Sequence, residues 1–210
     1  MGWSEQAEAA IERYRGGETR ELDQRQLTQL GNAAWAAGLC LRMAGRRDEA
    51  ADWLRTAAGR YRESWQEAPP DSWGRPIAAM KALLLVGEDA SDAARWALDA
   101  GARDAESPIG RYAGALALLV LGEDAEARAL GFTLCDREDF PPAVADSIVA
   151  LAAGDHAAYA LAIKAVLDSF EERADFLEDA RVADTVLVLQ LLASKRDSAV
   201  GLPESEVLPS

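Results

Sequence analysis

The chain has 210 residues, half of them apolar, and carries a formal net charge of −14. This length and composition are sufficient to bury one sizeable core and exclude a disordered chain. The surplus of carboxylates argues against nucleic acid, whose binding depends on basic side chains, and against an anionic membrane surface. Most of the surplus lies in residues 71–210, which hold 25 acidic and 12 basic residues. Such a surface favours a basic protein partner, although solubility alone would also account for it.

Apolar residues recur at three- and four-residue steps through the first third of the chain, which is the spacing of amphipathic helices. The pattern predicts a short helix over residues 3–14 and two longer helices over residues 22–44 and 48–66. Gly45 ends the first long helix, and the Pro69–Pro70 pair cannot continue the second. The two long helices are therefore expected to form an antiparallel hairpin.

The spacing of small residues in this hairpin resembles that of a tetratricopeptide unit. Counted from Gly31, the small residue of the first helix is Gly38, and the small residues of the second helix are Ala50 and Ala57. Small residues are needed where two paired helices touch closely. We therefore expect Ala50 and Ala57 to lie at the contact between the two helices.

A turn of similar sequence recurs along the rest of the chain. Its glycines, Gly45, Gly87, Gly122 and Gly154, are 42, 35 and 32 residues apart, which lies around the repeat length of helical solenoids. Each glycine is expected to end a helix in the left-handed conformation, and the acidic residue that follows is expected to cap the next helix. The recurrence predicts a series of helical hairpins.

The first helix of each later hairpin is much more apolar than the second. PIAAMKALLLVG and PPAVADSIVALAAG contain one charge each, and only Arg111 and Tyr112 interrupt the apolar stretch Ser107–Gly122. Such helices must be covered on nearly every side. Either the long N-terminal helices fold over this inner layer, or the layer binds an apolar surface of a partner. We favour coverage from within the chain.

The last quarter of the chain is also helical by its pattern. Residues 155–181 are typical of one long helix, or of two with a break near Ala174. An apolar helix over residues 182–193 follows, and the chain closes with a polar tail from Asp197. No stretch is typical of a strand.

Taken together, the patterns predict an all-α fold, an α-α superhelix of tetratricopeptide-like hairpins with about ten helices. We expect a single domain over residues 1–210. Within it, residues 1–70 form the N-terminal helices and the first hairpin, residues 71–196 form the acidic hairpin repeats, and residues 197–210 form the tail.

Side chains that would carry catalysis or hold a cofactor or metal are scarce. His156 is the only histidine, and neither a nucleophile elbow nor a glycine-rich phosphate loop accompanies it. Cys40 and Cys135 fall inside apolar helical patterns rather than at a disulfide or metal spacing, so we expect buried thiols. The first residues contain no apolar signal core. We expect a cytoplasmic protein without a catalytic, cofactor or metal site; an enzyme of unrecognised type is the weaker alternative.

Acidic residues supply the candidate contacts with a partner. Glu171, Asp175 and Asp179 are four residues apart, so a helix through this segment would align their carboxylates in one stripe. The stripe is compatible with a solvated face and with a docking site for a basic protein. The acids of the recurring turns would line up along one edge of a solenoid. The candidate contacts are Glu171, Asp175, Glu178, Asp179, Glu123 and Asp124.

Tryptophan is frequent in this sequence, with six residues. Three of them, Trp35, Trp53 and Trp96, lie on apolar helical faces and are expected in the core. Trp65 and Trp73 flank the proline linker instead. We expect these two to be exposed and available to a partner.

Apolar helical pairs such as SWGRPIAAMKALLLVGEDA, the closing helix DTVLVLQLLASKRD and the Leu-Pro near the end of the tail combine in the second part of the chain. From the Ser64–Trp65 region onward, the chain resembles the immunity protein 49 family of bacterial polymorphic toxin systems. The resemblance implies an all-helical cytoplasmic protein that binds a cognate toxin and blocks it, without catalysis of its own. A general tetratricopeptide-like scaffold or adaptor in a cytoplasmic complex is the alternative.

Overall fold

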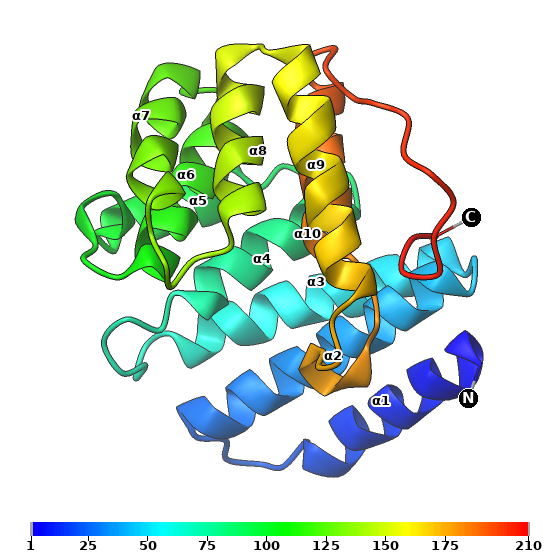
Figure 1. The fold of residues 1–210 in the computed structure, drawn as a ribbon. Coiled ribbons are helices and arrows are strands. Elements are labelled where there is room, and N and C mark those ends of the chain that lie inside the picture. The colour runs from blue at the N-terminus through cyan, green and yellow to red at the C-terminus, as the bar shows by residue number, and fades with distance from the viewer. Residues whose placement is uncertain (1, 210) are drawn as a thin grey trace.

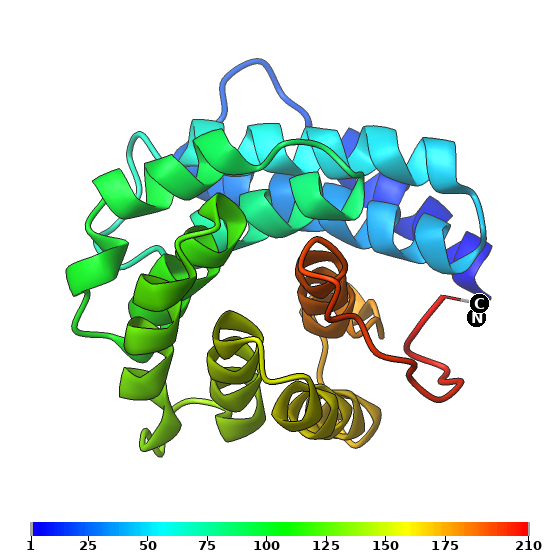
Figure 2. The same ribbon diagram turned by 90° about the horizontal axis from the view of Figure 1, so that it is seen from above.

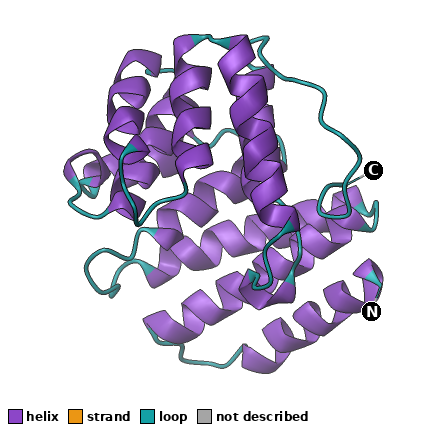
Figure 3. Ribbon diagram, viewed as in Figure 1, coloured by secondary structure: helices purple, strands orange, loops and turns teal. Residues whose placement is uncertain are grey.

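The computed structural model describes residues 2–209. Within this range the chain forms helices and loops and contains no strand (Figure 3). Two short 3-10 helices are present, η1 (Ala102–Asp104) and η2 (Leu177–Asp179). The α-helices are α1 (Trp3–Gly17), α2 (Gln24–Met43), α3 (Arg47–Ser64), α4 (Gly74–Leu85), α5 (Ser91–Asp99), α6 (Pro108–Leu121), α7 (Asp124–Cys135), α8 (Pro142–Ala153), α9 (His156–Glu171) and α10 (Asp184–Ser194). The predicted all-α fold of about ten helices is confirmed.

Each helix from α1 to α9 packs against the next one in the chain, so the fold is a series of helical hairpins (Figure 1). Seen from above, these nine helices follow a curve, and α10 lies inside it (Figure 2). This arrangement gives the bundle an inner side, where α4, α6 and α8 face α10, and an outer side.

The hairpin of α2 and α3 is held by the close contact that the small residues predict. A Cβ atom placed on Gly38 would lie 2.6 Å from Cγ of Leu54 and 3.2 Å from the carbonyl oxygen of Ala50. Ala50 and Ala57 are 2% and 0% exposed. Because there is no room for a larger side chain, the two helices approach closely here, which confirms the predicted contact at Ala50; Ala57 is buried.

The recurring turns also form as predicted. Gly45, Gly87, Gly122 and Gly154 have φ between 68° and 77°, the left-handed region that side chains with a Cβ disfavour. Capping by the acidic residues is less regular. Asp155 accepts a hydrogen bond from the backbone N–H of Ala158 at 3.0 Å, whereas Glu123 makes no capping bond to α7.

The inner layer is covered from within the chain, but the covering element is α10 rather than the N-terminal helices. Helix α10 is mostly apolar, and Val186, Leu189 and Leu192 are at most 1% exposed. A helix of this kind needs cover over most of its surface, which it finds inside the curve of the other helices. Helices α1 to α3 are amphipathic and extend the curve instead. The apolar side chains of the inner layer are buried, among them Ile77, Leu84, Leu116 and Ile148.

Polar contacts fix α10 at both ends. The Arg196 guanidinium lies 2.5 Å from the Asp124 carboxylate and donates to the carbonyl oxygen of Leu119 at 2.7 Å. At the other end, the N–H of Ala183 donates to the carbonyl oxygen of Val207 in the tail. None of the helices in the described part of the chain combines the length and the apolar character that a membrane span requires.

Candidate functional site

The acidic stripe predicted on one long helix does not form. Helix α9 ends at Glu171, and Glu178 and Asp179 adopt left-handed backbone conformations with φ of 54° and 59°. The segment turns back because Phe176 packs on Phe170, with ring centroids 6.1 Å apart, and Ala180 is buried. Like charges at four-residue spacing would also disfavour a helix here. Of the two alternatives, the continuous helix is therefore wrong, and the chain breaks close to Ala174; only the short 3-10 helix η2 follows the break.

The four candidate carboxylates of that segment, Glu171, Asp175, Glu178 and Asp179, therefore do not form one contact surface. Glu178 pairs with Arg13 of α1 at 3.1 Å, and Glu171 accepts a hydrogen bond from Ser205 of the tail at 2.6 Å. Asp175 and Asp179 are exposed. Two members of the candidate set thus fasten distant parts of the chain together.

The turn acids also have partners within the chain. Asp124 is the residue that holds Arg196 at the end of α10, and Glu123 lies 3.5 Å from Arg103. The carboxylate of Asp124 therefore serves the closure of the bundle. No other chain is needed to account for either residue.

The tryptophans beside the proline linker are less exposed than expected. Trp73 is 6% exposed, and its indole N–H donates to the Asp71 carboxylate at 2.9 Å. Trp65 is half-buried between Trp73 and Trp96, with ring centroids at 6.1 and 5.4 Å. The linker folds back so that Trp73 covers the start of α6, where a Cβ on Gly110 would lie 2.7 Å from the indole nitrogen. The prediction that Trp73 is exposed was wrong.

The two cysteines and the histidine lie on different helices and are buried to different degrees. Cys40 is buried, and burial raises the pKa of its thiol to about 11, so the thiol stays protonated at neutral pH. Cys135 is only half-buried, which departs from the prediction. His156 is exposed at the first position of α9. Across residues 2–209, no three side chains of the His, Cys, Asp and Glu types gather closely enough to hold a metal ion.

Two hollows in the surface are the remaining candidates. The first, here called the outer groove, has a volume of about 650 Å³ and is bounded by α7, α8 and α9. Phe132 of α7 and Leu161 of α9 rise from it and are 50% and 76% exposed. Arg128, Asp146 and Asp155 are its charged residues. Its floor consists largely of alanines: Ala143, Ala150, Ala153, Ala158, Ala162 and Ala165.

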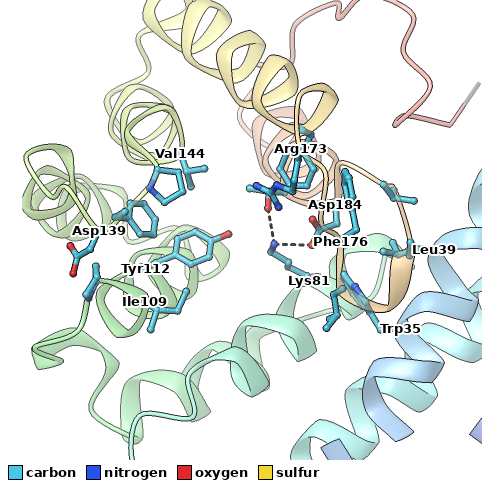
Figure 4. A pocket seen from close by; sticks show the side chains of 18 residues that line it. Trp35, Leu39, Lys81, Ile109, Tyr112, Asp139, Val144, Arg173, Phe176 and Asp184 are labelled. Atoms are coloured by element: carbon cyan, nitrogen blue, oxygen red, sulfur yellow. Dashed lines mark hydrogen bonds and ion pairs between the residues drawn. The ribbon is translucent and has the colours of Figure 1, made fainter. Parts of the chain in front are cut away.

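The second hollow, here called the inner cavity, has a volume of about 380 Å³ and lies between α2, α4, α6, α8 and the chain that links α9 to α10. Figure 4 shows side chains from these elements converging on it. Its aromatic lining residues are Trp35, Tyr112, Phe140, Phe170 and Phe176. Ile109 and Leu177 are exposed beside it, at 43% and 54%.

One end of the inner cavity holds a buried ion pair. The Lys81 ammonium lies 2.9 Å from the Asp184 carboxylate and donates to the Thr185 hydroxyl at 2.8 Å (Figure 4). Burial acts to lower the pKa of Lys81, but attraction to Asp184 outweighs it, so the pKa lies above its usual value. Lys81 is therefore a charged hydrogen-bond donor at neutral pH and not a nucleophile.

Tyr112 completes this polar end. Its side chain reaches from α6 into the cavity with the hydroxyl directed toward Lys81 (Figure 4). The residue is 5% exposed, and the hydroxyl has no hydrogen-bond partner among the described residues. Burial raises the pKa of Tyr112, which keeps the phenol protonated and able to donate.

The sequence indicates the inner cavity through polar residues in otherwise apolar helices, which the net charge of the chain does not show. Lys81 is the one charge in PIAAMKALLLVG, and Tyr112 is one of two interruptions in the most apolar helix. A lone polar side chain in a buried helix needs a partner or a function. Asp184 could not be assigned to Lys81 in advance, since it lies 103 residues further on.

Comparison of the chain with protein-family models, with curated proteins and with solved structures found no match.

Proposed function

We propose that this chain is a non-catalytic protein-binding module that receives a basic, amphipathic helix of a partner protein in the outer groove. The observation that carries the proposal is the exposure of Phe132 and Leu161 over an alanine floor. Large apolar side chains gathered around one hollow mark a surface that gains free energy when a partner covers it.

The shape of the outer groove favours a helix as the occupant. Alanine side chains let the backbone of a docking helix approach closely, while Phe132 and Leu161 stand as walls that would contact its apolar face. An apolar face at helical spacing is the usual ligand of such a groove.

The charge of the groove and its surroundings favours a basic partner. Asp146 and Asp155 outnumber Arg128, whose guanidinium lies over the Phe132 ring at 5.3 Å. Neither carboxylate has an ion-pair partner among the described residues. The wider surplus of acidic residues in 71–210 would steer a basic protein toward this face and make association sensitive to salt.

Within this class we propose an immunity role, in which the partner is a basic toxin and binding in the cytoplasm neutralises it. The resemblance of the second part of the chain to the immunity protein 49 family supports this role, together with the acidic surface. Co-expression with a basic toxin encoded beside this chain should preserve growth. The variant Phe132→Ser/Leu161→Ser should fail to protect at equal expression.

The docking surface is tested with two synthetic amphipathic helices that share a leucine face. One carries lysine and arginine on its polar face, and the other carries glutamate. Isothermal titration should show the basic peptide binding at least about tenfold more tightly, because opposite charges attract across the rim. The change Phe132→Ser/Leu161→Ser should weaken that binding by at least about tenfold, since it removes both apolar walls.

The matched control is Ile109→Ser/Leu177→Ser, which removes two apolar side chains of comparable exposure beside the inner cavity. This control should bind the basic peptide like the unaltered chain. Equal loss in both variants, or equal affinity for the two peptides, would contradict docking in the outer groove.

A further inference from the structure

The inner cavity is independent of the outer groove and offers a different chemistry. Its polar end presents a buried hydroxyl that the chain itself leaves without a hydrogen bond. Lys81 binds Asp184 and Thr185, and the Tyr112 hydroxyl is directed toward its ammonium group (Figure 4). That hydroxyl has no hydrogen-bond partner among the described residues. Buried polar groups are nearly always hydrogen-bonded in folded proteins, so the Tyr112 hydroxyl calls for an acceptor.

The charge balance of the cavity points the same way. Asp184 is paired with Lys81, and Asp139 is paired with Arg137 at 2.8 Å. Arg173 stands at the cavity without a carboxylate partner among the described residues, its guanidinium stacked over the Phe170 ring at 4.2 Å. In a chain with a net charge of −14, this is a local site for an anion.

The rest of the lining determines what kind of anion can fill the cavity. The aromatic rings of Phe140 and Phe170 face the space, and they offer no hydrogen bonds to the remaining oxygens of a small, strongly hydrated ion. A volume of about 380 Å³ lies at the lower end of pockets for small organic ligands, which start at about 300 Å³. The ligand therefore needs an apolar body as well as an acceptor.

We propose that the inner cavity binds a small carboxylic acid with an aromatic body. Its carboxylate accepts hydrogen bonds from Lys81 and Tyr112, and its ring lies among the aromatic side chains on the opposite side. Arg173 attracts the anion at the entrance. The groups that recognise the ligand thus come from α4, α6 and the chain between α9 and α10.

Phenylacetate is the probe that tests this assignment, with acetate and phenylethanol as matched compounds that lack the ring and the charge respectively. Binding is followed by titration in ligand-observed NMR. We expect phenylacetate to bind at least about tenfold more tightly than either compound, since a charge-assisted hydrogen bond and ring contacts act together. Equal binding of acetate would show a simple anion site, and equal binding of phenylethanol would show an apolar hollow; either result overturns the proposal.

The decisive variant is Tyr112→Phe, which removes the unpartnered hydroxyl and keeps the ring. It should weaken phenylacetate binding about tenfold while the protein stays folded, because the buried ring and its packing are kept. Arg173→Gln should also weaken binding, and more so at low salt. Unchanged affinity in Tyr112→Phe, or no detectable binding of phenylacetate to the folded wild-type chain, would overturn the proposal. The variant Phe132→Ser/Leu161→Ser serves as the control and should bind phenylacetate normally.

Discussion

The outer groove and the inner cavity have similar apolar walls but differ in how they are built. The outer groove lies on three helices that follow one another in the chain, and its charged residues stay in contact with water. The inner cavity joins elements from α2 to α10 and contains a buried ion pair between Lys81 and Asp184. Side chains of the groove can therefore be changed without loss of the fold, whereas the polar end of the cavity is part of what holds the fold together.

The largest expected effect follows from breaking the buried pair. Asp184→Ala leaves the Lys81 ammonium without its carboxylate in a buried site and should lower the free energy of unfolding by roughly 3 kcal/mol. The matched change in the groove, Asp146→Ala, should stay within about 0.5 kcal/mol. Chemical denaturation of both variants measures the difference. Similar values for the two would show that the cavity is as tolerant as the groove.

A smaller effect is expected when both partners are replaced together. The variant Lys81→Met/Asp184→Leu removes both charges and fills the space with apolar atoms, so it should lose less stability than Asp184→Ala alone.

The pKa of Lys81 is raised above its usual value of 10.5, so the stability that its charge contributes is fully present below that pH and is lost as the pH rises through the folded-state pKa.

Alkaline denaturation separates this contribution from those of other groups. The unaltered chain should lose more stability above pH 10.5 than the double variant does, because only the former carries the paired ammonium. Parallel stability curves for the two proteins would mean that the pair contributes nothing that depends on the charge of Lys81.

Sequence patterns predicted the features that depend on neighbouring residues. The glycine turns and the close approach of Gly38 to Ala50 in the first hairpin follow from short-range chemistry. These features account for the helix boundaries and for the hairpin series. They do not determine where the last helix is placed.

The errors concern contacts between distant parts of the chain. Asp124 appeared available to a partner, yet it holds Arg196, which lies 72 residues away. Phe176 lies where the periodic pattern predicts a helix. It instead packs on the Phe170 ring and lines the inner cavity. Both hollows are formed by several helices together, so periodicity along one helix could not show them.

The smallest expected effect concerns the exposed acids beside the inner cavity. If Asp175 and Asp179 stood on one helical stripe, Asp175→Lys/Asp179→Lys would relieve repulsion and raise stability. They instead lie in the link between α9 and α10, Asp175 in a loop and Asp179 at the end of the 3-10 helix η2, and both are exposed. We expect the free energy of unfolding to change by less than about 0.5 kcal/mol.

The same double reversal distinguishes the two hollows in binding. It should leave the basic peptide in the outer groove nearly unaffected at moderate salt, since the turn between α9 and α10 does not line that groove. It should strengthen phenylacetate binding slightly at low salt, because two added ammonium groups near the inner cavity attract the anion. Titrations of both ligands at two salt concentrations measure these changes. A large loss of peptide affinity would place the protein-docking surface over Asp175 and Asp179 rather than over Phe132 and Leu161.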